Sequence, residues 1–179
     1  MPEITVAEGT VSYRIVGPAE SDHPPVLFVH GVLADSRLWD RVADQLAGRG
    51  YRCVLPDLPL GSHTIPLDQG ATISPRALAR IIRDLIVELD LADVTLVGCD
   101  TGGALCQFVI DEYPDLIARL VLTNCDAFDR FPPAPFKQVF ALLRGPASIR
   151  PMLNGMRLRA LRHSPLGYGC LLYTSDAAD

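Results

Sequence analysis

The stretch VTLVGCDTGGALCQFVI, Val94 to Ile110, constrains the fold of this chain more than any other part of the sequence. It begins with an apolar run, Val94 to Val97, that is long enough for a buried strand and too short for a helix. Gly98 and Gly102 then enclose a five-residue turn. Apolar residues follow at helical spacing: Leu105, Phe108 and Val109. The stretch therefore predicts a strand, a sharp turn and a helix in direct succession.

The middle residue of the predicted turn is Asp100. A strand, a turn with glycine at both ends and a helix form a nucleophile elbow, whose middle residue projects from the top of a sheet in a strained conformation. Gly98 and Gly102 suit this turn because a side chain at either position would collide with a neighbouring strand or helix. Serine is usual in the middle, and the aspartate decides the chemistry. The alternative is that Asp100 serves only as a helix N-cap.

The rest of the chain predicts an α/β fold with a mostly parallel sheet and helices on both faces. Besides the elbow strand, five strands are expected: Ile4–Ala7, Thr10–Val16, Val26–Val29, Tyr51–Leu55 and Arg119–Thr123. One helix is expected between Asp35 or Ser36 and Gly48, with an apolar face formed by Leu38, Val42 and Leu46. Another begins at Ser74-Pro75, with an apolar face formed by Leu78, Ile81, Ile82, Leu85, Ile86 and Leu89. The strand that ends near Thr123 should have one unpaired edge.

The character of the sequence changes after Asp126. We expect residues 1–130 to form the sheet domain and residues 131–169 to begin a helical insertion, with a proline-rich connector followed by a short amphipathic helix marked by Phe136, Val139, Phe140 and Leu143. Residues 170–179 match, codon for codon, the translation of a sequencing-library adaptor. We therefore expect this tail to be non-native read-through and the natural protein to continue past Gly169.

Composition excludes several classes of function. The net charge is −5, yet the segment from Arg130 to Gly169 holds seven basic residues and no acidic ones, which indicates either two regions that dock on each other or an anion-facing surface. Neither a nucleic-acid-binding module nor a phosphate or dinucleotide motif accompanies the arginines. No apolar run reaches the length of a membrane span, and no secretory signal is evident. Five cysteines without CxxC spacing indicate reduced thiols in a cytoplasmic protein and argue against a structural zinc site.

Three motifs carry a resemblance to a known family. They are LFVHG at Leu27–Gly31, LPDLPLG at Leu55–Gly61 and LVGCDTGG at Leu96–Gly103. With them the chain resembles the N-terminal half of an α/β-hydrolase, and most closely the branch with an aspartate nucleophile that includes haloalkane dehalogenases and epoxide hydrolases. On this resemblance, residues 131–169 would begin a helical cap over the active site.

The resemblance implies a set of site residues. Asp100 would be the nucleophile, and the backbone N–H groups of Val32 and Thr101 would form the oxyanion hole, supported by His30 and Gly31. Asp126, at the end of the strand after the elbow helix, is a candidate for the acid that orients the catalytic histidine. Its alternative is a strand-end residue that bonds to the next turn. Cys99 and Cys106 flank the site and are interpreted as small buried thiols, and Trp39 as a core residue.

The implied activity is hydrolysis of a small apolar substrate, with a carbon–halogen bond or an epoxide, through an ester on Asp100. An aspartate is already ionised at neutral pH and needs no base to attack, but a histidine must activate the water that cleaves the ester. In the family that histidine lies beyond the cap, so we expect it to be absent from this chain. No cofactor or metal is implied, and the oligomeric state stays open.

Two features depart from the family pattern and keep alternatives open. Thr101 stands where these enzymes often carry tryptophan, and neither the asparagine of many dehalogenases nor the proline of epoxide hydrolases follows His30-Gly31. The alternatives are a ligand-binding member of the fold without catalysis, and a hydrolase of ester or carbon–carbon bonds in the same superfamily.

Overall fold

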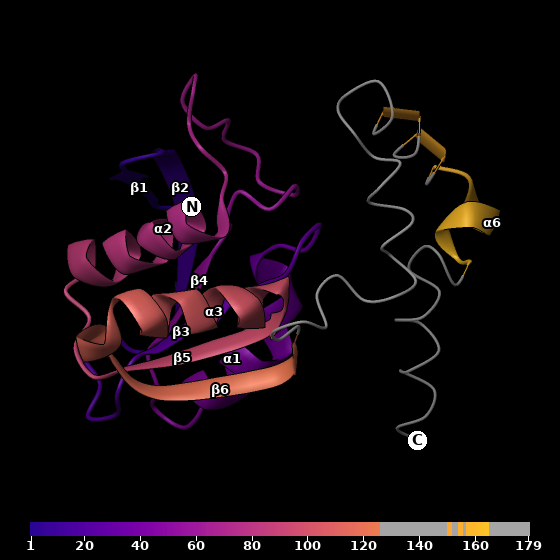
Figure 1. The fold of residues 1–179 in the computed structure, drawn as a ribbon. Helices are drawn as coiled ribbons and strands as arrows, with labels where there is room; N and C mark the ends of the chain where they lie inside the picture. The colour runs from indigo at the N-terminus through magenta and orange to yellow at the C-terminus, as the bar shows by residue number, and fades with distance from the viewer. Residues whose placement is uncertain (126–149, 152–153, 156, 165–179) are drawn as a thin grey trace. The chain divides into compact units, whose positions relative to one another are not determined.

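The computed structural model describes residues 1–125, 150–151, 154–155 and 157–164. The chain divides into two compact units, residues 1–129 and 130–179. In the described part of the first unit, six strands form one sheet in the order β1-β2-β4-β3-β5-β6 (Figure 1). Their bounds are β1 Glu3–Val6, β2 Gly9–Val16, β3 Val26–Val29, β4 Cys53–Pro56, β5 Val94–Asp100 and β6 Ile117–Cys125.

The sheet is mostly parallel, as predicted. Strands β4, β3, β5 and β6 run parallel to one another, and the β1–β2 hairpin joins them through an antiparallel pairing of β2 with β4. Each predicted strand exists; Val26–Val29 has the predicted bounds, and the ends of the other strands differ from the prediction by at most three residues. Because parallel strands place their carboxyl ends at one edge, the turns after β3, β4 and β5 all open at the same edge of the sheet.

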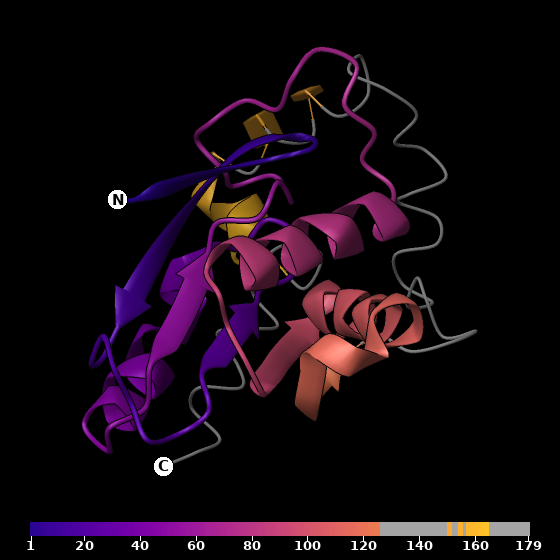
Figure 2. The ribbon, with the colours of Figure 1, turned by 90° about the vertical axis from the view of Figure 1, so that its left-hand side faces the viewer.

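Helices cover the sheet on both faces. They are α1 Asp40–Ala47, α2 Pro75–Glu88 and α3 Thr101–Glu112, with two 3₁₀ turns, η1 Ser36–Trp39 and η2 Pro114–Leu116. Helix α2 begins as predicted, because the Ser74 hydroxyl accepts a hydrogen bond from the Ala77 N–H at 3.1 Å and Pro75 occupies the first turn. Figure 2 shows α2 and α3 side by side, in contact with each other.

The main core lies between the sheet and helices α2 and α3. The predicted apolar face of α2 is buried there, and Leu85 and Ile82 are completely inaccessible. The opposite face of the sheet has a smaller core, formed by Phe28 and Val97 with Trp39 and Ala43. The interpretation of Trp39 as a core residue is therefore confirmed.

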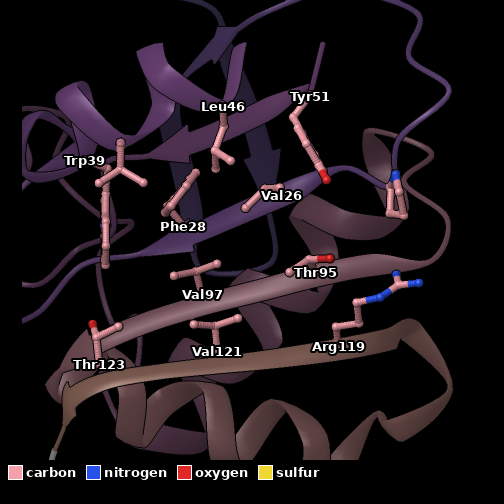
Figure 3. A pocket seen from close by; sticks show the side chains of 12 residues that line it. Val26, Phe28, Trp39, Leu46, Tyr51, Thr95, Val97, Arg119, Val121 and Thr123 are labelled. Atoms are coloured by element: carbon pink, nitrogen blue, oxygen red, sulfur yellow. The ribbon is translucent and has the colours of Figure 1, made fainter. Parts of the chain in front are cut away.

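The predicted apolar face of the first helix was wrong for Leu38 and Val42, whereas Leu46 is partly buried and packs against the smaller core. Leu38 is 51% exposed and Val42 is 45% exposed, because the buried contacts are made by Trp39 and Ala43 on another side of the same segment. Val42 and Leu46 instead border an apolar groove of about 530 Å³, whose floor is formed by side chains from β3, β5 and β6 (Figure 3).

Strand β6 is the last strand of the sheet within the described residues, where it pairs only with β5. Three consecutive apolar residues, Leu120 to Leu122, are each about two-fifths exposed. Since neighbouring residues of a strand point to opposite faces, both faces of β6 are incompletely covered.

The described part of the second unit contains the short helix α6, Arg159–Arg162, with Leu158 and Leu161 exposed. The predicted amphipathic helix around Phe140 and the adaptor-like tail lie outside the described residues. No helix in the described ranges is both long and apolar enough to cross a membrane.

Candidate active site

Asp100 is the last residue of β5 and directly precedes the first residue of α3. Its backbone has φ 53° and ψ −135°, a region that L-residues rarely adopt and that costs on the order of 1–3 kcal/mol. The side chain is exposed and accepts no capping hydrogen bond from α3. It also forms no ion pair within the described residues. The carboxylate therefore does not act as the N-cap that the alternative interpretation required.

Close backbone approaches hold this turn in place. A Cβ added to Gly98 would lie 2.6 Å from the Cys106 sulfur, and one added to Gly102 would lie 2.5 Å from the His30 carbonyl oxygen. Both distances are too short for real atoms, and the second obstacle is main chain that cannot rotate away. Glycine at these positions lets α3 approach both its own strand and β3, and this contact aims Asp100 at the edge of the sheet.

Gly31 makes the same kind of contact with the carboxylate itself. A Cβ added to Gly31 would lie 2.8 Å from Cβ and 2.9 Å from Cγ of Asp100. The side chain of Asp100 therefore occupies the space that a residue larger than glycine would fill. The turn after β3 forms one wall of the site.

His30 supports that turn through hydrogen bonds of both ring nitrogens. It is fully buried, and its Nε2 accepts a hydrogen bond from the Leu58 N–H at 2.9 Å, so its Nδ1 carries the hydrogen and donates to the Gly31 carbonyl at 2.9 Å. Burial lowers the pKa of His30. With both ring nitrogens engaged and the ring neutral, His30 has no free nitrogen with which to act as a base toward Asp100.

The predicted oxyanion donors are the N–H groups of the residues that follow Asp100 and Gly31 in the chain. Thr101 follows Asp100, and its N–H belongs to the first turn of α3, where N–H groups have no acceptor within the helix. Val32 follows Gly31, is 47% exposed, and its N–H has no partner within the part of the chain that the structure describes. Two unpaired N–H groups beside a carboxylate form a region that favours negative charge.

Three thiols lie close to the elbow. Cys106 is buried, as interpreted from the sequence, but Cys99 is only partly buried. Cys125, which sequence reasoning left without comment, pairs with Asp100 in the register of β5 and β6. Burial raises the pKa of the Cys99 thiol, and the nearby Asp100 carboxylate adds to this effect. At neutral pH Cys99 is therefore a weaker nucleophile than its position suggests.

The remaining candidates lie elsewhere or outside the described residues. His23 stacks on Tyr51 at 4.3 Å, just before β3 and so at the opposite edge of the sheet from Asp100. His63 accepts a hydrogen bond from the Gly61 N–H. Asp126 lies outside the described residues, as does most of the predicted cap, of which residues 150–151, 154–155 and 157–164 are described. Within the described ranges, no cluster of side chains could hold a metal ion.

Sequence reasoning missed the residues that hold the turn after β3. Leu33 has φ 61°, its N–H donates to the Leu60 carbonyl at 2.9 Å, and its own carbonyl accepts from the Ser62 hydroxyl at 2.8 Å. Asp57 accepts a hydrogen bond from the Ser36 N–H at 2.8 Å. The signal was the LPDLPLG motif, whose first two residues end β4, a strand whose carboxyl end lies beside that of β3.

Comparison with known proteins gives consistent matches. Residues 24–155 match the family model described as alpha/beta hydrolase fold. The uncharacterized protein Rv2715 of Mycobacterium tuberculosis is 34% identical over 113 residues, which are 63% of this chain and 31% of that protein. A haloalkane dehalogenase of Psychrobacter cryohalolentis is 30% identical over 119 residues, which are 66% of this chain and 38% of that enzyme.

The solved structure of a thermophilic esterase from Thermogutta terrifontis superimposes with a TM-score of 0.61 at 23% identity, over 74% of this chain and 48% of the esterase. At that identity the likeness concerns the fold alone. The chain spans roughly a third of the length of the two curated relatives, at 31% and 38%.

Proposed function

The chain belongs to the α/β hydrolase fold family, and we propose that within this family it carries the nucleophile of a hydrolase, Asp100, which attacks a small apolar substrate with a carbon–halogen bond or an epoxide. The observation that carries the proposal is the exposed carboxylate at φ 53°, which forms no cap bond and lies against Gly31. The match to a haloalkane dehalogenase supports it.

The chemistry follows from the side chain. An ionised carboxylate oxygen of Asp100 attacks the sp³ carbon of the substrate and a C–O bond forms. With a haloalkane, the carbon–halogen bond breaks and halide leaves with the electron pair; with an epoxide, the ring C–O bond breaks and the ring oxygen keeps the pair and takes a proton from solvent water. The product is an ester on Asp100. The N–H groups of Val32 and Thr101 favour the charged carboxylate before attack and the oxyanion when water later attacks the ester carbonyl.

The second half of the reaction needs a base that activates water, and His30 cannot supply it because both of its ring nitrogens are hydrogen-bonded. We therefore expect the chain to be alkylated once and to keep the ester. Completion of the cycle would need another base, and we propose a histidine for this role.

Intact-mass spectrometry after incubation with a haloalkane or an epoxide tests the proposal. We expect one added group, mapped to Asp100 in the peptide digest and absent from Asp100→Asn. Hydroxylamine cleaves an ester and leaves a thioether intact, so it separates Asp100 from alkylated Cys99. Asp93→Asn is a matched control, since Asp93 also has a positive φ, at 55°, but precedes the opposite end of β5.

Three outcomes would contradict the proposal. A chain that binds the compound reversibly without gaining mass would favour the ligand-binding alternative. Sustained turnover by this chain would show that a base is present and would refute the single-alkylation mechanism. An ester hydrolase would instead release alcohol from a carboxylic ester while leaving haloalkanes untouched.

A further inference from the structure

Asp57 is the first residue after β4, and its carboxylate lies between β2 and the turn that follows β3. Its Oδ1 accepts a hydrogen bond from the Ser36 N–H at 2.8 Å, and its Oδ2 lies 3.4 Å from the Ser12 hydroxyl. The Asp57 N–H donates to the Ser12 carbonyl at 2.9 Å, so the residue is fixed to β2 through its main chain. From this fixed position the carboxylate holds the first residue of η1.

The residues after Asp57 hold the same turn at two further points. The Leu58 N–H donates to His30, and the Leu60 carbonyl accepts from the Leu33 N–H. Residues 30, 33 and 36 are thus each bonded to the segment 57–60. These three bonds enclose Gly31 and Val32, and they keep Leu33 at a positive φ that an unsupported leucine would leave.

Together these contacts connect Asp57 to the carboxylate of Asp100. Gly31 lies against the side chain of Asp100. A displacement of the turn would therefore move Gly31 and the Val32 N–H relative to the nucleophile. We infer that Asp57 is a positioning residue: by holding Ser36 it sets the turn that orients Asp100 for attack. This inference rests on the proposed function of Asp100.

A positioning role fits the burial of the partners. Ser36 is 2% exposed and Ser12 is 7% exposed, so a lost carboxylate leaves their polar groups without water to replace it. The Ser36 hydroxyl also accepts from the Arg14 guanidinium at 3.2 Å, and Arg14 pairs with Asp40. Ser36 is therefore held by Arg14 as well as by Asp57.

The test measures the rate of Asp100 alkylation against haloalkane concentration, which yields a maximal rate and a half-saturating concentration. For Asp57→Ala we expect the maximal rate to fall about tenfold or more, since misplacement of a reacting group by 1 Å costs on the order of a hundredfold. The half-saturating concentration should stay unchanged, because no contact of Asp57 reaches Asp100 directly.

Asp57→Asn keeps an oxygen that can accept a hydrogen bond from the Ser36 N–H, and should recover part of the rate. Asp44→Ala, at an exposed position on α1, is the control.

A second readout is independent of alkylation. Amide hydrogen exchange in residues 31–36 should accelerate in Asp57→Ala and remain near the wild-type rate in Asp57→Asn. If the wild-type chain is not alkylated, the proposed function fails and hydrogen exchange alone decides whether Asp57 holds the turn. If the wild-type chain is alkylated and Asp57→Ala reacts equally fast, or exchange in residues 31–36 is unchanged, the inference is overturned. Should Asp57→Ala not fold, Asp57→Asn must still show a lower maximal rate than wild type.

Discussion

Acidification should destabilise the chain through His30, the buried imidazole beneath the turn after β3. Burial lowers its pKa below the ordinary value of 6.5, and the hydrogen bond to Gly31 and the carboxylates of Asp57 and Asp35 only partly oppose this shift. The hydrogen bonds of the ring give a second reason why the folded chain disfavours protonated His30. A protonated ring must carry a hydrogen on Nε2, where it would face the Leu58 N–H, so that two donors oppose each other.

The sign and size of the effect follow from linkage. Since the folded pKa is the lower one, the unfolded chain binds a proton at His30 before the folded chain does, and stability is lost as the pH falls through 6.5 toward the folded pKa. If the folded ring stays neutral throughout, the free energy of unfolding should drop by about 1.4 kcal/mol between pH values of roughly 7.5 and 5.5. This is the upper limit for one titrating group.

Urea unfolding followed by the fluorescence of Trp39 measures this change, because Trp39 is the only tryptophan and is packed against Phe28 at 5.0 Å. The amide in His30→Gln can donate and accept hydrogen bonds but does not titrate. This variant should therefore lose the pH dependence of stability that comes from His30 and keep the pH dependence that comes from every other group. Its stability should therefore fall less than that of wild type over the same pH range. Parallel curves for the two proteins would refute the reasoning.

Two further substitutions test the packing, each with an internal control. Gly102→Ala should destabilise the chain by about 1–3 kcal/mol or more in urea unfolding, because its Cβ meets the main chain of His30. Gly48→Ala is the control: Gly48 has φ −61° and its Cβ would make only ordinary contacts, so this variant should be neutral or stabilising by about 0.4–1 kcal/mol. Leu85→Ala should cost about 2–5 kcal/mol, and Val87→Ala, at a position 52% exposed on the same helix, less than roughly 1 kcal/mol. Equal losses within either pair would contradict the packing described here.

Much of the architecture could be predicted because its signals are local. The cap at Ser74 and the apolar face of α2 are properties of one segment, and the structure agrees with both. The elbow is also local, since its glycines and its apolar flanks are contiguous in the chain. Conversely, the apolar face of α1 was wrong because a spacing of apolar residues does not reveal which side of a helix has something to pack against. Trp39 and Ala43 face the sheet, and Val42 faces the groove.

The support of the site could not be predicted, because it depends on contacts between distant segments. The bond between Leu58 and His30 joins residues 28 positions apart, and that between Asp57 and Ser36 joins residues 21 apart. The sequence placed His30 at a strand end and suggested a supporting hydrogen bond. The partner of that hydrogen bond could not be identified from the sequence. Its identification requires the order of β3 and β4 in the sheet and the positive φ of Leu33.

In the elbow, the glycines that allow the backbone shape are different residues from the aspartate proposed to react. The shape of the elbow depends on Gly98, Gly102 and the wall at Gly31, where even a methyl group does not fit. The side chain of Asp100 fills the space beside Gly31, but it forms no capping hydrogen bond with α3. The reacting group at position 100 can therefore be exchanged without loss of a capping hydrogen bond, whereas a side chain at any of the three glycines would collide with its neighbours.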